Sequence, residues 1–498
     1  MAEEIEIKLA LPESSRRALL RHPLLRAAER LPTRKLASIY YDTPALDLHR
    51  RGIALRARRQ AGRWLQTVKC AGLAGGGLSQ RPEWEQPFSG RFDFSAVDDA
   101  EARELLERAR DEARLETVFE TLFTRRSWRL RPKSGGAVLL MLDQGWIAAS
   151  GRREALGEIE IELELGAPAC LFDVARALAA ELPLQPEQRS KAERGYRLRE
   201  NAPLVPVKAA RSPVRPEQAP LEAFAATVAD CLAQFQANAA GIGKADAEFV
   251  HQMRVALRRL RSALRLFRPL LPDGLEAAVA PPLRELAACL GQARDWDVLA
   301  EDILAPAARA FPGEPRLAAL AAAVERRRLA ARADLPAASQ ARPFILAQLD
   351  IAACAFRRSV VADAPALPKF AARRLARLRR KAMALAQAAQ DMDAQRLHGL
   401  RIGVKRLRYA AEFLAPLLRR RDLRRTLEVL NDLQDSLGGL NDLARAGPLL
   451  AQCLDDDPQL REAVALAGGW HGPRYAALQD QARRGMRRLL RLPPLRAG

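Results

Sequence analysis

The first 200 residues contain short segments in which charged and apolar side chains alternate, and this pattern limits the possible folds most. Successive side chains of a strand point to opposite faces. Glu4, Glu6 and Lys8 therefore share one face, opposite Ile5 and Ile7. Similar segments occupy 4–11, 53–59, 63–69, 81–88, 137–147 and 157–165, and two more lie near 35–41 and 121–131. Gly-rich and Pro-rich stretches separate several of them, which predicts about eight antiparallel strands in a meander or barrel.

Charged rows of both signs recur on these strands. Arg56 and Arg58 form a basic row, and an acidic row consists of Glu158, Glu160, Glu162 and Glu164. On a single strand such a row is ordinarily the solvated face. The opposite faces here are apolar enough to need cover from helices, which we expect near 13–21, 98–110, 170–181 and 190–199. We therefore expect an α+β domain, an eight-stranded antiparallel barrel with its charges inside and flanking helices outside.

A charged barrel interior needs a partner for its charges. Buried charges are costly unless they are paired, solvated or bound to something, and four glutamates in a row cannot pair with one another. Mg²⁺ and Mn²⁺ prefer carboxylate oxygens, while arginine suits phosphate oxygens. The pattern predicts a site for a divalent metal and a phosphate chain. The sequence has no P-loop, no HExxH motif and no nucleophilic Ser/His/Asp set to support another hydrolase design.

The charge balance points to a polyanionic partner. The 498 residues carry a formal net charge of +21, which suits nucleic acid, an acidic membrane surface or phosphate chains. The alternative explanation of this charge is a GC-rich genome that encodes arginine at solvent-exposed positions without a binding role. The six cysteines are scattered without a CxxC pair, and no stretch reads as a signal peptide or a membrane span. We expect a soluble cytoplasmic protein without disulfides or a zinc site.

The composition and the sequence pattern of the chain change near residue 210. Residues 201–220 contain five prolines and predict a stiff linker between a domain at 1–200 and a second domain at 221–495. The second domain is rich in Ala, Leu and Arg and predicts helices throughout. HQMRVALRRLRSALRLF at 251 recurs as HGLRIGVKRLRYAAEFL at 398, and the same offset pairs Asp295 with Asp442. We expect an all-α bundle of two similar halves, at about 221–365 and 366–495.

The repeated helix has a basic face beside an apolar stripe. Arginines on a helix face are usually just solvated, and a single histidine at a helix start is usually structural. Because the same set of residue types occurs twice at one offset, a shared binding role explains the pattern as well as simple solvation does. The basic positions of the two copies are His251, Arg254, Arg258 and Arg261, and His398, Arg401, Lys405 and Arg408.

The first domain resembles CYTH domains, the triphosphate tunnel metalloenzymes. The resemblance starts at the ExExK pattern of Glu4, Glu6 and Lys8. It continues, in order, through YYDTPALDLHRRGIALRAR (40–58), TVK (67–69), RPEWE (81–85), LDQG (142–145), EIEIELELG (158–166) and SKAERGY (190–196). It implies that the acidic residues of the first and last strands hold the metal, with the register of the last row left open: Glu4, Glu6, Glu158, Glu160 and Glu162.

The same resemblance implies the remaining tunnel residues and an activity. The basic residues that would hold phosphate are Lys8, Arg56, Arg58, Lys69, Arg81, Arg125 and Lys191, and further tunnel residues are Glu83, Glu85 and Asp143. The implied activity is a Mg²⁺- or Mn²⁺-dependent inorganic triphosphatase that splits tripolyphosphate into pyrophosphate and phosphate. An adenylate cyclase, a thiamine or nucleoside triphosphatase, and a non-catalytic polyphosphate-binding or targeting protein stay open as alternatives.

The second domain resembles CHAD domains over about 220–495, through an HxxRxxxRRxR-like motif in which Lys405 replaces an arginine. The resemblance implies that the basic face binds inorganic polyphosphate, and it raises an association with polyphosphate granules. The charge pattern alone would suit nucleic acid equally. Membrane association is disfavoured, because the basic helices keep ordinary core stripes.

Overall fold

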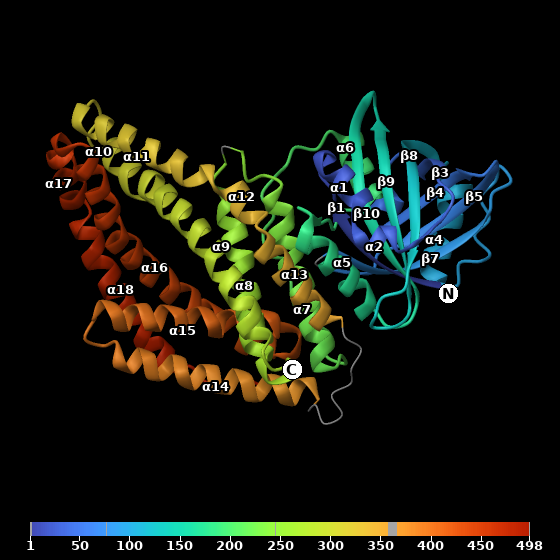
Figure 1. The fold of residues 1–498 in the computed structure, drawn as a ribbon. Coiled ribbons are helices and arrows are strands. Elements are labelled where there is room, and N and C mark those ends of the chain that lie inside the picture. The colour runs from blue at the N-terminus through green and yellow to red at the C-terminus, as the bar shows by residue number, and fades with distance from the viewer. Residues whose placement is uncertain (1, 76, 245, 357–365, 498) are drawn as a thin grey trace. The chain divides into compact units, whose positions relative to one another are not determined.

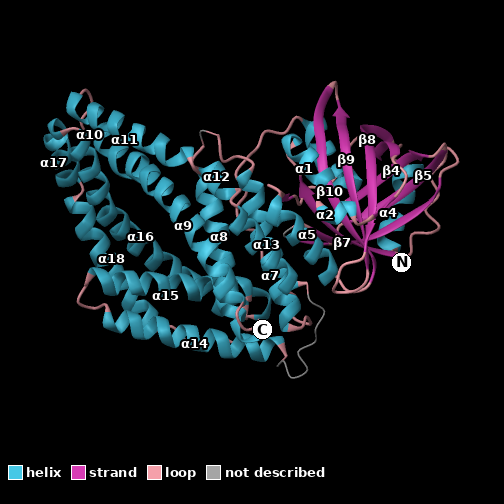
Figure 2. Cartoon of the chain, in the orientation of Figure 1, coloured by secondary structure: helices cyan, strands magenta, loops and turns pink. Residues whose placement is uncertain are grey.

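The computed structural model describes residues 2–75, 77–244, 246–356 and 366–497. The chain forms two compact units (Figure 1). One consists of residues 1–204 with 340–358, and the other of residues 205–339 with 359–498. The strands lie in the first unit, and the second unit is helical (Figure 2).

A closed antiparallel barrel forms the centre of the first unit. Its eight long strands follow the order β1, β10, β9, β8, β3, β4, β5, β7, and pairing of β7 with β1 closes it. Closure confirms the expected fold. The strands are β1 (Ala2–Ala10), β3 (Arg34–Asp42), β4 (Ile53–Gln60), β5 (Arg63–Cys70), β7 (Leu78–Pro87), β8 (Glu116–Leu130), β9 (Ala137–Ala149) and β10 (Arg152–Leu165), with the short β2 (Glu29–Arg30), β6 (Leu73–Gly75) and β11 (Gln185–Pro186) beside them.

Tight turns set the register of two hairpins. Ala61 and Gly62 between β4 and β5 have φ values of 48° and 82°, and Ser150 and Gly151 between β9 and β10 have φ values of 50° and 76°. Two consecutive residues with positive φ make a turn whose twist matches that of the strands. The register decides which side chains face the interior, because a slip by one residue would turn every charged side chain outward.

Helices cover the apolar outer face of the barrel. They are α1 (Arg16–Arg21), α2 (Pro23–Arg26), α3 (Asp47–Arg50), α4 (Ala100–Asp111), α5 (Ala169–Glu181) and α6 (Lys191–Glu200). Leu106 of α4 packs in one cluster with Leu55, Val68 and Trp84 of the strands. Helix α5 packs on β1, β9 and β10. Burial of the apolar rows on this side leaves the charged rows for the interior.

Helix α13 (Arg342–Ala355) belongs to the barrel unit although it lies within the second half of the sequence. It packs against α5, where Asp350 pairs with Arg176 at 2.9 Å. Ile345, Leu349 and Ile351 of α13 are buried. The sequence boundaries placed this segment with the helical domain, because an apolar stripe does not tell which partner covers it.

The second unit consists of helices. They are α7 (Pro220–Ala239), α8 (Glu248–Phe267), α9 (Leu275–Val298), α10 (Ala305–Ala310), α11 (Pro315–Ala333), α12 (Leu335–Ser339), α14 (Leu367–Ala388), α15 (Ala394–Phe413), α16 (Arg420–Asp456), α17 (Arg461–Trp470) and α18 (Gly472–Leu490). The two copies of the sequence repeat are α8 and α15, which pack against each other. Within the described residues, no helix combines the length and apolarity that crossing a membrane requires.

The proline-rich segment is irregular and is hydrogen-bonded to the second unit. Val207 exchanges two backbone hydrogen bonds of 2.9 Å with the side chain of Asn238 on α7. Ser212 donates a hydrogen bond of 2.6 Å to the carbonyl oxygen of Phe413. The part of the expected linker that follows residue 204 is therefore tied to the helical unit.

Candidate functional site

The barrel encloses a cavity of about 480 Å³ that is lined almost entirely by polar side chains. Seven basic and six acidic residues contribute to it. The basic residues are Lys8, Arg56, Arg58, Lys69, Arg81, Arg125 and Lys191; the acidic residues are Glu4, Glu6, Glu83, Glu85, Glu160 and Glu162; the others are Tyr40, Ala54, Gln60, Ser190 and Ala192.

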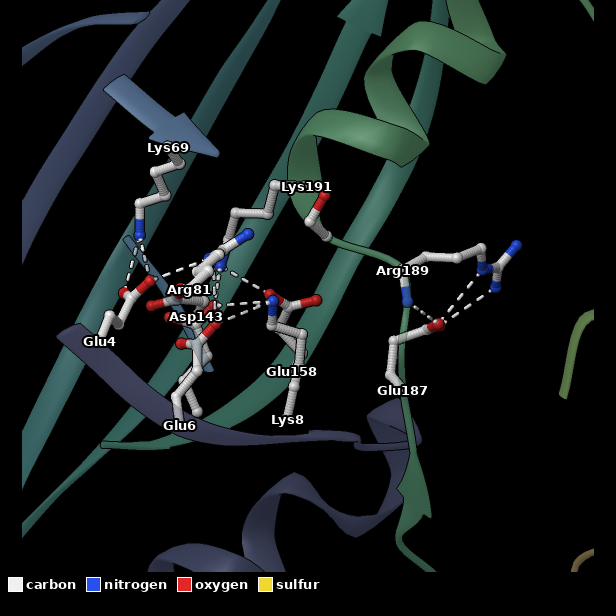
Figure 3. A network of polar contacts seen from close by, with 12 residues as sticks. Glu4, Glu6, Lys8, Lys69, Arg81, Asp143, Glu158, Glu187, Arg189 and Lys191 are labelled. Atoms are coloured by element: carbon white, nitrogen blue, oxygen red, sulfur yellow. Dashed lines mark hydrogen bonds and ion pairs between the residues drawn. The ribbon is translucent and has the colours of Figure 1, made fainter. Parts of the chain in front are cut away.

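Strand register places most of the inward charges opposite a charge of the other sign. Glu4 on β1 faces Arg81 on β7, and the guanidinium Nε lies 3.0 Å from the carboxylate. Lys69 on β5 faces Glu83 on β7 at 3.1 Å and also donates to Glu4 at 2.7 Å (Figure 3). Opposite charges directly across a strand pair stabilise the pairing. These ladders explain how the barrel holds so many buried charges.

Among the residues expected in the tunnel, two facing pairs carry charges of the same sign. One is Asp143 with Glu158, which both pair with Lys191 in the wall, and the other is Glu6 with Glu162 in the cavity. Glu6 on β1 lies directly opposite Glu162 on β10. Glu6 accepts from Arg81 at 3.1 Å and lies 3.4 Å from Lys8, whereas Glu162 makes no ion pair with any described residue. Burial, reinforced by the nearby carboxylates Glu4 and Glu6, raises the pKa of Glu162 to about 7. A carboxylate in this position is only partly ionised near neutral pH, and a cation that joined the site would favour its ionised form.

On β4, the cations outnumber their carboxylate partners. Arg58 faces Ser38 in the register and donates to its hydroxyl at 3.1 Å, and no described carboxylate forms an ion pair with it. Burial, with the guanidinium groups of Arg56 and Arg125, lowers the pKa of Arg58 to about 10. Arg56 lies 3.7 Å from Glu83 and leaves its Nε without a hydrogen-bond acceptor. These two arginines are open to an anion.

Three buried carboxylates converge beside the cavity, but an ammonium group occupies their centre. Nζ of Lys191 lies 2.7 Å from Asp143, 2.6 Å from Glu158 and 2.8 Å from Glu160 (Figure 3). Asp143, Glu158 and Glu160 have the spacing of a metal-binding triad. Lys191 shares these carboxylates with Arg125, which pairs with Asp143 and Glu160, and with Arg194, which pairs with Glu158. Because three cations already pair with the three carboxylates, we assign this triad to holding Lys191 rather than to a metal.

Local sequence explains how Lys191 reaches this position. Ser190 and Glu193 form a capping box at the start of α6, in which each side chain accepts from the other residue's backbone N–H. This arrangement satisfies donors that a helix start leaves unpaired. Arg194, one turn into α6, donates to Glu158 at 3.2 Å and to Glu154 at 2.7 Å. The helix is thus fastened to β10 with Lys191 aimed inward.

Neighbouring charges control the ionisation of the buried acids. Burial opposes ionisation of Glu160, yet Lys191, Arg125 and Lys8 hold its pKa well below the usual range. Burial likewise opposes ionisation of Glu4, and Lys69 and Arg81 outweigh it to lower its pKa. Both carboxylates therefore carry their charge at neutral pH, in contrast to Glu162.

Most of the residues expected in the tunnel line the cavity. Asp143 and Glu158 do not; they lie in the wall, bonded to Lys191. Tyr40 and Ser190 also line the cavity, although the sequence patterns did not predict either of them there. Tyr40 shares the inward side of β3 with Ser38, and both face the arginines of β4 in the register. Period-two alternation from Ser38 to Tyr40 was the signal that could have identified it.

In the helical unit, basic side chains of both repeats lie together. Arg254, Arg258 and Arg401 act electrostatically on Lys405, and Arg258 acts on Arg261. Arg254 lies 3.5 Å from Asp295. We call this group the basic cluster; it consists of His251, Arg254, Arg258, Arg261, Arg401 and Lys405. Apart from Arg254, its members form no ion pair within the described residues.

The two repeats are not equivalent at every expected position. His251 is half-buried with Nδ1 unbonded, whereas His398 is exposed. Arg408 donates to Glu412 at 2.7 Å and to Gln434 at 3.0 Å, so its charge is already compensated. Arg445 on α16 joins the cluster through Asp295 at 2.6 Å, and the sequence analysis missed it. Its position in the repeat, near Asp442, was the available signal.

Comparison with known proteins identifies both domains. Residues 2–196 match the family model "CYTH domain" and residues 226–451 match "CHAD domain". An inorganic triphosphatase from Haemophilus influenzae is 30% identical over 208 residues, which cover 40% of this chain and 55% of that protein. The chain thus matches about half the length of this curated relative.

The crystal structure of the CHAD domain from the plant Ricinus communis is similar with a TM-score of 0.52. It is 32% identical and covers 59% of this chain and 99% of that chain. The two family models match separate segments that together span most of the sequence. The chain belongs to the proteins in which a CYTH domain is followed by a CHAD domain.

Proposed function

We propose that the barrel is a metal-dependent inorganic triphosphatase that hydrolyses tripolyphosphate to pyrophosphate and phosphate. The observation that carries this proposal is the separation of unbalanced charges within one cavity. Within the described residues, Glu162, opposite Glu6, forms no ion pair with a cation, and Arg58, beside Arg56, forms none with a carboxylate. A metal ion and a phosphate chain bound together would satisfy both sides.

The charge of the cavity supports this pairing of ligands. Seven basic and six acidic side chains nearly cancel, so the walls alone do not neutralise a triphosphate. The donor set of Glu4, Glu6 and Glu162 consists of carboxylate oxygens, which fit Mg²⁺ or Mn²⁺. A metal ion held by these residues would screen the negative charge of the phosphate chain and polarise its oxygens.

The lining favours an inorganic triphosphate as substrate. Tyr40 is the one aromatic side chain among the described residues that line the cavity, and an apolar face on which a base or a thiazolium ring could stack is lacking there. The relative from Haemophilus influenzae carries the name inorganic triphosphatase. Both points favour tripolyphosphate over ATP or thiamine triphosphate.

The chain's own residues would perform most of the catalytic work through positioning and charge. Arg56 and Arg58 bind phosphate oxygens and stabilise the charge that develops on the departing pyrophosphate. Lys69 and Arg81 keep Glu4 ionised. Glu162 would serve as a metal ligand, and a bound metal ion would favour its ionised form over the protonated form that burial favours in the free protein.

Phosphate release tests this proposal. The purified chain is incubated with tripolyphosphate, ATP or thiamine triphosphate, each with Mg²⁺, Mn²⁺ or EDTA. Variants are Glu6→Gln and Glu162→Gln, with Glu13→Gln as control because Glu13 is exposed. We expect metal-dependent release from tripolyphosphate, lost in the two tunnel variants alone. No metal-dependent release, or equal release by Glu6→Gln and the wild type, would refute the enzyme and leave a binding protein.

For the helical unit we propose inorganic polyphosphate as the partner, held by the basic cluster. The supporting observation is that Arg258, Arg261 and Lys405 make no ion pair within the described residues. Such binding should weaken steeply with salt, as polyanion binding does through counterion release. The triple variant His251→Ala, Arg254→Ala, Arg258→Ala should lose it, whereas removing three exposed charges at Arg420, Arg421 and Arg425 should not. Equal loss in both would refute the assignment.

A further inference from the structure

Lys405 stands where the sequence repeat places an arginine in the first copy. With the offset between the copies, Lys405 on α15 corresponds to Arg258 on α8. An arginine keeps its charge in almost any protein environment, whereas a lysine loses its proton readily when it is desolvated. The exchange therefore changes what the position can do, although both residues are formally basic.

The surroundings of Lys405 are cationic. Among the described helices, the main contacts of α15 are with α8, α14 and α16. Helix α8 contributes Arg254 and Arg258, and Arg401 lies one turn earlier on α15 itself. These three guanidinium groups all act on the half-buried amine of Lys405.

The carboxylates nearby do not compensate this charge. Asp442 of α16 acts on Lys405 but forms no ion pair with it within the described residues. Asp295 is bonded to Arg254 and Arg445. On the remaining side, α14 presents the apolar Leu385 to Gly403 of α15. Lys405 is thus the one lysine in a group of arginines, without an anion of its own in the described structure.

The consequence is a neutral amine in the free protein. Burial, with the charges of Arg258 and Arg401, lowers the pKa of Lys405 to about 6. At neutral pH most of the Lys405 side chain is therefore uncharged. A bound polyanion would add negative oxygens to the cluster and favour the ammonium form again.

We propose that the helical domain takes up one proton from solvent at the amine of Lys405 when it binds a polyphosphate chain, so that its affinity falls as the pH rises. The step converts the amine and a solvent proton into an ammonium ion, with no other bond changed. The inference rests on the proposed polyphosphate-binding function of the basic cluster and adds a regulation to it.

Linkage gives the size of the effect. If the bound chain restores the ordinary ionisation of lysine, affinity falls by up to about tenfold per pH unit between about pH 7 and about pH 9. Arginine at the same position would stay charged throughout this range and remove the dependence. His251 in the same cluster has a lowered pKa from burial and Arg294, and it is retained in the arginine variant, so its contribution can be subtracted.

Calorimetry on the full chain with long-chain sodium polyphosphate tests the inference at constant ionic strength. Titrations at about pH 7, 8 and 9, in buffers with different ionisation enthalpies, report both the affinity and the protons taken up. We expect an affinity loss of at least tenfold over this range and close to one proton bound near pH 8. Lys405→Arg should bind at least as well and lose most of both effects. Lys208→Arg, an exposed lysine, should behave like the wild type.

Lys405→Met gives a second check, because it removes the titrating group without adding a charge. Its affinity should lie below that of the wild type between about pH 7 and about pH 9, by a margin that narrows as the pH rises, and should not itself rise as the pH falls. Wild-type binding that is tight but independent of pH, or a pH dependence unchanged in Lys405→Arg, would overturn the inference and leave the proposed binding intact. Absence of polyphosphate binding by the wild type at every pH would refute both.

Discussion

Two arginines of the barrel should respond in opposite ways to the same substitution. Arg58 has no described carboxylate partner, whereas Arg125 donates to Asp143 at 2.7 and 2.6 Å and to Glu160 at 2.5 Å. Replacing either with methionine removes one buried positive charge and keeps an apolar stem of similar length. The stability change should therefore report whether the charge had a partner.

The pKa of Arg58 gives the magnitude for the first variant. Its decrease from 12.5 to about 10 corresponds to about 3 kcal/mol by which the folded protein disfavours the charge. Losing the hydrogen bond to Ser38 offsets about 1 kcal/mol of the relief. A net gain of about 2 kcal/mol should raise the melting temperature of the barrel by about 4–8 °C.

The second variant should lose stability. Arg125→Met leaves Asp143 and Glu160 with a buried negative charge that Lys191 compensates only in part. Breaking a buried ion pair by removing one partner costs about 3–5 kcal/mol, which lowers the melting temperature by roughly 10 °C. Both variants should lose triphosphatase activity, Arg58→Met by about 10²–10³ in kcat, because the arginine would bind the phosphate chain.

Differential scanning calorimetry in EDTA, with and without tripolyphosphate, measures these changes. Tripolyphosphate should raise the melting temperature of the wild type more than that of Arg58→Met, since the stabilisation by a ligand at a given concentration grows with the logarithm of its affinity. Both proteins are compared at one ligand concentration. If Arg58→Met unfolds below the wild type while Arg125→Met matches it, the description of Arg58 as an uncompensated cation is wrong.

Three further perturbations follow from the same structure. The folded protein raises the pKa of Glu162 from 4.5 to about 7. The stability of the wild type in EDTA should therefore fall as the pH rises through this interval and then level off. Urea titrations at several pH values measure this fall, and Glu162→Gln should remove it. Arg258→Ala should weaken polyphosphate binding and reduce the slope of log affinity against log salt by about one; an unchanged slope would place Arg258 outside the binding surface. Gly145→Ala would bring a Cβ against the carbonyl oxygen of Leu122 on β8, so it should destabilise the barrel by about 2 kcal/mol or more, and a wild-type melting curve would contradict the strand register.

Alternation in the sequence was enough to predict the barrel. The strands, the covering helices and the eight-membered closed sheet all follow from which side chains can be buried, because period-two rows of charge opposite apolar rows leave few arrangements. The offset between His251 and His398 likewise predicted two related helices, α8 and α15, since a long repeat reflects a repeated packing unit.

The pairing of individual charges could not be predicted in this way. The acidic row of β10 was equally compatible with several metal ligands, and only the register with β1 placed Glu162 opposite Glu6. Asp143 and Glu158 had the right chemistry for the tunnel, yet Lys191 from α6 occupies the space between them and Glu160. Arg408 had the right position in its repeat, but Glu412 neutralises it.

The sequence by itself thus determined the kinds of residue in each interior row, and with them the barrel, the helical repeat and the two families. Tertiary structure decided which charges have an ion-pair partner and which, at Glu162, Arg58 and Lys405, have none within the part of the chain that the structure describes. The physical reason is the sequence distance between the groups that interact. Strand and helix patterns depend on neighbours a few residues away, whereas a Coulomb interaction depends on groups brought together from distant parts of the chain, and it changes sign with a single neighbour.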